Sequence, residues 1–126
     1  MGTNKKRTEE FVASVKDRTI KTAVIGLGYV GLPLALTMVE RGFTVIGYDL
    51  SQSLIFELKQ GNPRLITVPR QRLCDALATG RFLPTCDSDD LKPAQAYIIC
   101  VPTTLDHHHK PDLSFVINAS KLISKY

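Results

Sequence analysis

Three glycines stand close together just after an apolar run in the first third of the chain. Gly26, Gly28 and Gly31 follow residues 22–25 with the spacing Gly-x-Gly-x-x-Gly. Glycine permits a tight turn at the first position, close approach of the backbone to a phosphate at the second, and close helix packing at the third. By itself the spacing is a weak signal, because glycines also serve turns and helix contacts without any ligand.

An acidic residue follows at the distance that such a site requires. Asp49 lies 18 residues after Gly31, near the expected separation of about 20, at the end of a run rich in strand-forming residues. A carboxylate there can accept hydrogen bonds from the ribose hydroxyls of a dinucleotide, and it would repel the 2′-phosphate of NADP. We therefore predict an NAD site, in preference to the alternative in which Asp49 is an ordinary loop residue.

The elements that would position these residues form a strand–helix–strand unit. The continuous apolar run 22–26 predicts a strand buried on both faces, and residues 43–48 predict a second one. Between them, apolar residues at helical spacing predict a helix over 29–41, with Pro33 in its first turn and Gly42 as its stop. Phosphates would lie against the free N–H groups at the start of this helix.

The remaining sequence predicts an α/β fold of Rossmann type, a doubly wound parallel sheet truncated to about four strands. Helices are expected over 51–60, capped by Ser51, over 70–79, and from Asp112 onward, where Asp112 would be the cap. A short strand is expected over 82–86, and a buried strand over 96–101. Residues 1–20 are expected to form a disordered tail (1–8) and a leading helix (9–18), and residues 21–126 the N-terminal part of the NAD-binding domain. Because the sequence ends within an amphipathic pattern, we expect it to belong to a longer protein.

Composition narrows the class of protein. The chain has 126 residues, of which 44% are hydrophobic and 22% charged, values typical of a globular domain. Its net charge of +4 includes Lys5, Lys6 and Arg7, but no aromatic residues interleave with them, so we expect no nucleic-acid partner. The sequence shows neither a signal peptide nor a membrane-length apolar run, and we expect a cytoplasmic protein that does not contact a membrane.

Cysteines and histidines offer no metal site in this sequence. Cys74, Cys86 and Cys100 have spacings that match no zinc pattern, and Cys100 lies in an apolar run that predicts a small buried hydrophobic residue. The consecutive residues His107, His108 and His109 are expected to form a solvated loop, because adjacent histidines without other ligands bind metals poorly.

Several separated segments match one family in the order in which that family carries them. They are residues 24–35, 41–43, 45–49, 83–87, 98–105 and 111–116. Over about residues 20–126 the chain resembles the NAD-binding domain of the UDP-glucose/GDP-mannose dehydrogenase family, and within it the UDP-N-acetylglucosamine and N-acetylmannosamine 6-dehydrogenases.

The resemblance implies an NAD-dependent oxidoreductase that converts the C6 alcohol of a UDP-sugar to a carboxylate with two NAD⁺. It implies that Tyr29 and Val30 line the cofactor site beside the three glycines, that Asp49 holds the ribose, and that Thr103 contacts the cofactor. The catalytic cysteine, lysine, asparagine and aspartate of the family would lie beyond residue 126, as would the sugar-binding part. We therefore expect this chain alone to be inactive and to self-associate through strand 96–101.

The sequence also departs from the family at several positions, and two other interpretations remain open. Thr104 stands where a proline is usual, Val68-Pro69-Arg70 where Glu-Pro-Gly is usual, and Leu54 where a basic residue is often found. The alternatives to a dehydrogenase segment are a non-catalytic dinucleotide-sensing module and an inactive truncated remnant.

Overall fold

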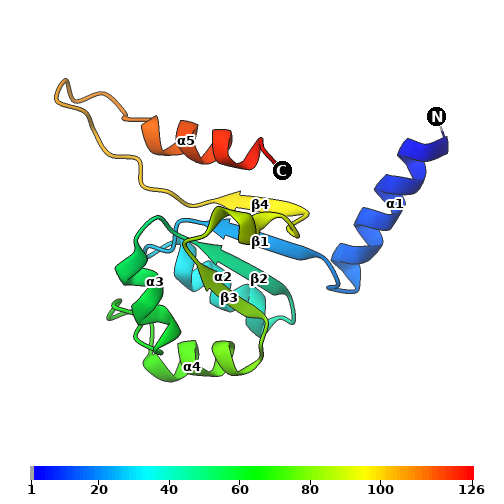
Figure 1. Ribbon diagram of the computed structural model, residues 1–126, viewed down its shortest axis with the longest axis horizontal. Helices are drawn as coiled ribbons and strands as arrows, with labels where there is room; N and C mark the ends of the chain where they lie inside the picture. Colours follow the sequence, from blue (N-terminus) through cyan, green and yellow to red (C-terminus); the bar gives the residue numbers. More distant parts are fainter. Residues whose placement is uncertain (1) are drawn as a thin grey trace.

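Four short strands form one parallel sheet within residues 2–126, the part of the chain that the computed structural model describes (Figure 1). The strands are β1 (Lys21–Ile25), β2 (Thr44–Tyr48), β3 (Phe82–Thr85) and β4 (Ala96–Ile99). They lie in the order β3-β2-β1-β4, and each neighbouring pair is parallel. This order is that of the first four strands of a Rossmann sheet, which confirms the predicted fold class.

Helices cover both faces of the sheet. The helices α2 (Gly31–Glu40), α3 (Gln52–Lys59) and α4 (Arg70–Ala78) pack on one face, against Val24, Val45 and Phe82. The 3₁₀ turn η1 (Ser88–Leu91) and α5 (Ser114–Ile123) pack on the other face, against Ala23 and Ile46. Successive side chains of a strand point to opposite faces, so burial on both sides explains why residues 23–25 of β1 and residues 45–48 of β2 form continuous apolar runs.

The predicted helix boundaries around α3 and α4 are confirmed closely. The Ser51 hydroxyl accepts a hydrogen bond from the Leu54 N–H at 3.2 Å and caps α3, as expected. Gly61 and Gly80 follow the ends of α3 and α4. The helix after the glycine loop, by contrast, begins at Gly31 and not at residue 29, so Tyr29 and Val30 stay in an exposed loop.

The N-terminal residues differ from the expectation of a disordered tail followed by a helix over 9–18. Instead, α1 (Gly2–Lys16) is a continuous helix that projects from one end of the sheet (Figure 1). Its first half contains Lys5, Lys6 and Arg7, which favour helix formation, and Lys6 lies 3.9 Å from Glu10 one turn later. A polar composition is therefore compatible here with helix as well as with disorder. Met1 lies outside the described residues.

The C-terminal part requires two corrections. We expected a buried strand over 96–101, but β4 ends at Ile99 and its residue Ile98 is 37% exposed. The Asp112 side chain accepts a hydrogen bond from the Ser114 N–H at 3.0 Å, but Leu113 and not Asp112 occupies the N-cap position of α5. In the described residues 2–126, every helix is too short or too polar to span a bilayer.

Candidate dinucleotide-binding site

A cleft of about 1240 Å³ opens at the carboxyl ends of β1, β2 and β4, between these ends and α5. This is where open parallel sheets bind their ligands. The predicted site residues that line it are Gly26, Gly28, Tyr29, Val30, Asp49 and Thr103. Gly31, the remaining predicted site residue, is buried and does not line the cleft.

Gly26 forms the turn that leaves β1. Its φ is +96°, and an added Cβ would lie 2.7 Å from the Cys100 carbonyl oxygen. Its N–H donates to the Tyr48 carbonyl at 2.8 Å, which keeps the turn in register with β2. Both the backbone conformation and the close contact exclude a side chain at this position.

Gly28 and Gly31 are glycines for different reasons. A Cβ at Gly31 would lie 1.7 Å from the Gly26 carbonyl oxygen, so the close approach of α2 to the glycine loop requires glycine there. A Cβ at Gly28 would meet nothing within 4 Å and would point into open space. The fold therefore explains the glycine at position 31, whereas no contact among the described residues requires a glycine at position 28.

Tyr29 and Val30, just before the start of α2, form part of the cleft wall. Val30 occupies the N-cap position, and its apolar side chain makes no cap hydrogen bond. Tyr29 and Val30 are 79% and 62% exposed, a large apolar surface to leave in water beside a cleft. An uncapped helix start with a partial positive charge is suited to a pyrophosphate.

Asp49 connects the two ends of the expected site. Its Oδ2 accepts a hydrogen bond from the Leu27 N–H and its Oδ1 one from the Ser51 N–H, both at 2.9 Å. The Asp49 N–H donates to the Thr85 carbonyl at 3.1 Å, so β3 also fixes the residue. Each carboxylate oxygen has a second lone pair that can accept from a ribose hydroxyl. The carboxylate thus has a structural role in the glycine loop that the sequence did not indicate.

Cys100 differs from the expectation of a fully buried residue within a strand. It lies just past β4, is half-buried, and lines the cleft. Burial raises the pKa of its thiol, which keeps it protonated at neutral pH and makes it a poor nucleophile, as expected.

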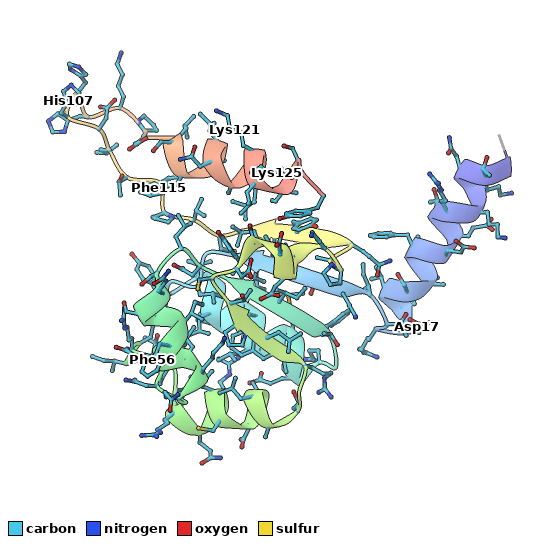
Figure 2. All side chains as sticks on the ribbon, viewed as in Figure 1. Asp17, Phe56, His107, Phe115, Lys121 and Lys125 are labelled. Carbon is cyan, nitrogen blue, oxygen red and sulfur yellow. The ribbon has the colours of Figure 1, made fainter. Side chains whose placement is uncertain are left out.

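The histidines lie at the tip of the loop between β4 and α5, and Figure 2 shows His107 far from the sheet. Across residues 2–126, side chains of histidine, cysteine, aspartate and glutamate do not gather into a group of three that could hold a metal ion.

Residues of α3, of α5 and of the turn that follows α5 also line the cleft, and the sequence analysis did not select them. They are Leu54, Phe115, Asn118, Lys121, Leu122 and Lys125. Lys121 lies in the last turn of α5, whereas Lys125 lies in the turn just past the helix end at Ile123, so no helical spacing pointed to the pair. Two cations and several apolar side chains give this wall a composition that suits an anionic, partly aromatic ligand.

The strand order, the glycine turn and the carboxylate after β2 define a Rossmann-type dinucleotide-binding domain. The family model for the NAD-binding domain of the UDP-glucose/GDP-mannose dehydrogenase family matches residues 20–126. The chain belongs to this family as its NAD-binding domain, and NAD is its cofactor.

Related proteins and solved structures agree with this membership. The chain is 39% identical over 108 residues to UDP-N-acetyl-D-glucosamine 6-dehydrogenase of Pseudomonas aeruginosa, covering 86% of this chain and 25% of that protein. The solved UDP-D-ManNAc dehydrogenase of Pyrococcus horikoshii superposes with a TM-score of 0.76 at 33% identity, over 84% of this chain and 25% of the other. The GDP-mannose dehydrogenase of Pseudomonas aeruginosa gives 0.76 at 30% identity, over 81% and 24%. The chain thus spans about a quarter of the length of these relatives.

Proposed function

We propose that this chain binds NAD with its adenosine ribose on Asp49 and its pyrophosphate over Gly28 and the start of α2. The observation that carries the proposal is the hydrogen bond from the Leu27 N–H to Asp49, which joins this carboxylate to the glycine loop in the wall of one cleft. Tyr29, Val30 and Thr103 lie on the walls of the same cleft and would contact the cofactor beyond the pyrophosphate.

The reaction that this domain would serve is oxidation of the C6 alcohol of a UDP-sugar to a uronate. The proposal follows from family membership and from relatives named as UDP-N-acetylhexosamine dehydrogenases. NAD, when bound, supplies a hydride acceptor for each of two oxidation steps. The part of this chain is to bind and orient that cofactor at the carboxyl ends of β1 and β4, where Thr103 stands at the rim.

Direct titration with reduced cofactors tests the binding site. We expect the chain to bind NADH at least about tenfold more tightly than NADPH, because the Asp49 carboxylate repels a 2′-phosphate. The fluorescence of the nicotinamide reports binding directly, and the chain contains no tryptophan to interfere. Equal or tighter binding of NADPH would contradict the assignment of Asp49.

We expect the 126-residue chain to produce no NADH from NAD⁺ and UDP-sugars. Cys100 is the cysteine that lines the cleft, and the raised pKa of its thiol disfavours the thiolate that a nucleophile needs. Absorbance at the NADH band, with UDP-N-acetylglucosamine and UDP-N-acetylmannosamine as substrates, measures this. Turnover that depends on the sugar would show that the chain contains catalytic groups we have not identified.

We expect the chain expressed alone to self-associate through β4. This strand pairs with β1 on one side only, and Ile98 is partly exposed beside its free edge. Ile98→Lys should reduce association, whereas Ile99→Lys should destabilise the fold, because Ile99 packs against the second core cluster. Light scattering combined with a thermal melt separates the two effects. A monodisperse native monomer would exclude the edge as a contact.

A further inference from the structure

A chain of hydrogen bonds runs from the ribose end of the cleft to a cation on the loop after α3. The Ser51 hydroxyl, which lines the cleft, lies 3.2 Å from the Ser53 hydroxyl. Nη2 of Arg64 donates to the Ser53 hydroxyl at 3.0 Å. Arg64 is therefore two hydrogen bonds away from a residue of the cleft wall, and Ser51 itself donates its N–H to Asp49.

Glu57 holds this cation in place. Arg64 donates to both carboxylate oxygens of Glu57, from Nε to Oε2 and from Nη2 to Oε1 at 3.1 Å. Ser53 and Glu57 lie on the outer face of α3 with Phe56, which Figure 2 shows pointing away from the sheet. Because the side chains of the pair are 41% and 34% exposed, the guanidinium has room to move if Glu57 releases it.

The carboxylates of Glu57 and Asp49 both interact with the Arg64 guanidinium. The pKa of Arg64 is raised, first by its hydrogen bond to Glu57 and then by the charges of Glu57 and Asp49. The same hydrogen bond lowers the pKa of Glu57. The guanidinium therefore lies within the electrostatic reach of the carboxylate to which we assign the ribose.

The backbone at Arg64 also favours this arrangement. Its φ is +58°, which is uncommon for a residue other than glycine, and its N–H donates to the Asn62 side chain at 3.2 Å. From this position the Arg64 side chain extends back to α3 and meets Ser53 and Glu57.

We propose that Arg64 is a cofactor-selectivity residue of this site and that Glu57 withholds it from a 2′-phosphate. The inference rests on the proposed NAD site at Asp49. In the native chain, a phosphate at the ribose 2′ position meets the Asp49 carboxylate and a guanidinium already bound at two points by Glu57. A guanidinium released from Glu57 could instead bind the phosphate at two points, the geometry in which arginine binds such groups most strongly.

The test measures the ratio of NADPH to NADH affinity, a quantity that a purely structural effect would leave unchanged. We expect Glu57→Gln to raise this ratio by about five- to tenfold at low salt and less at high salt. Glutamine preserves side-chain length and helix propensity, so the variant should fold. Adding Arg64→Gln to Glu57→Gln should return the ratio to the native value or below it.

A second arginine–glutamate pair provides a matched control. Arg72 also donates to both carboxylate oxygens of Glu40 and to the Thr37 hydroxyl, but among the described residues no side-chain hydrogen bond joins this group to a residue that lines the cleft. Glu40→Gln makes the same change in net charge and should leave the ratio at its native value.

The outcomes separate this inference from the proposed function. If Glu57→Gln and Glu40→Gln gave the same ratio of NADPH to NADH affinity, the inference would be overturned. NADH binding by the native chain would in that case still support the proposed site. If the ratio of NADPH to NADH affinity stayed raised in the double variant that lacks both Glu57 and Arg64, the inference would also be overturned, because a group other than Arg64 would then bind the 2′-phosphate. Native chain that binds neither NADH nor NADPH would overturn both proposals.

Discussion

Gly31→Ala should cost the domain on the order of 3 kcal/mol of its free energy of unfolding or more. The added Cβ would lie 1.7 Å from the Gly26 carbonyl oxygen, and the backbone of the glycine loop cannot move away without breaking its contacts to β2 and β4. Since domains of this size have only about 5–15 kcal/mol in total, the variant should melt at a much lower temperature or fail to fold. Thermal and urea denaturation followed by circular dichroism measure the change.

Gly28→Ala is the matched control for that experiment. An added Cβ at this position meets nothing within 4 Å, so the free energy of unfolding should change by less than about 1 kcal/mol. NADH affinity should nevertheless fall by about tenfold or more, because the methyl group would occupy the space that the pyrophosphate needs. If the two substitutions were equally harmless to folding, or if Gly28→Ala bound NADH normally, our division of roles between these glycines would be wrong.

Asp49→Ala should weaken NADH binding by about 1–3 kcal/mol, or roughly 5- to 150-fold. The substitution removes the acceptor for the ribose, and it also releases the N–H groups of Leu27 and Ser51 that the carboxylate now binds. Part of the loss should therefore appear in a titration of NADH, and part as a lower melting temperature in the absence of cofactor.

Asp49→Asn separates these two effects. The asparagine side chain keeps one oxygen for the Leu27 N–H, so the melting temperature should lie closer to that of the native chain than to that of the alanine variant. Loss of the negative charge should still reduce discrimination against NADPH. Normal NADH affinity in the alanine variant would show that the ribose does not bind at Asp49.

The parts of the fold that could be predicted from the sequence are those in which local chemistry and burial agree. Strands β1 and β2 are buried on both faces and therefore contain continuous apolar runs, and Ser51 caps α3 with its own hydroxyl. The glycine spacing identified the loop, since Gly26 and Gly31 are required by backbone contacts that any such turn must make. In these places the residue type is determined by burial or by a contact with a residue nearby in the sequence.

The remaining features depend on contacts that the sequence does not display. The extent of α1 could not be predicted because charged residues such as Lys5 and Lys6 are compatible with helix and with disorder alike. The partial exposure of Ile98 on β4 could not be predicted, because a continuous apolar run is equally typical of a strand whose side chains are buried on both faces. The hydrogen bond from Leu27 to Asp49 and the contact of Arg64 with Ser53 join residues on different elements, and only the folded chain brings them together.

The hydrogen bonds of Asp49 also bear on how tightly a cofactor can be held. A flexible glycine-rich segment loses conformational entropy when a ligand orders it, and this loss reduces the affinity that the contacts would otherwise give. In this chain the bond from the Leu27 N–H to Asp49 restrains the loop in the absence of any ligand. Folding, rather than binding, therefore supplies part of that ordering, which would lower the entropic cost of binding the pyrophosphate that we propose for this loop.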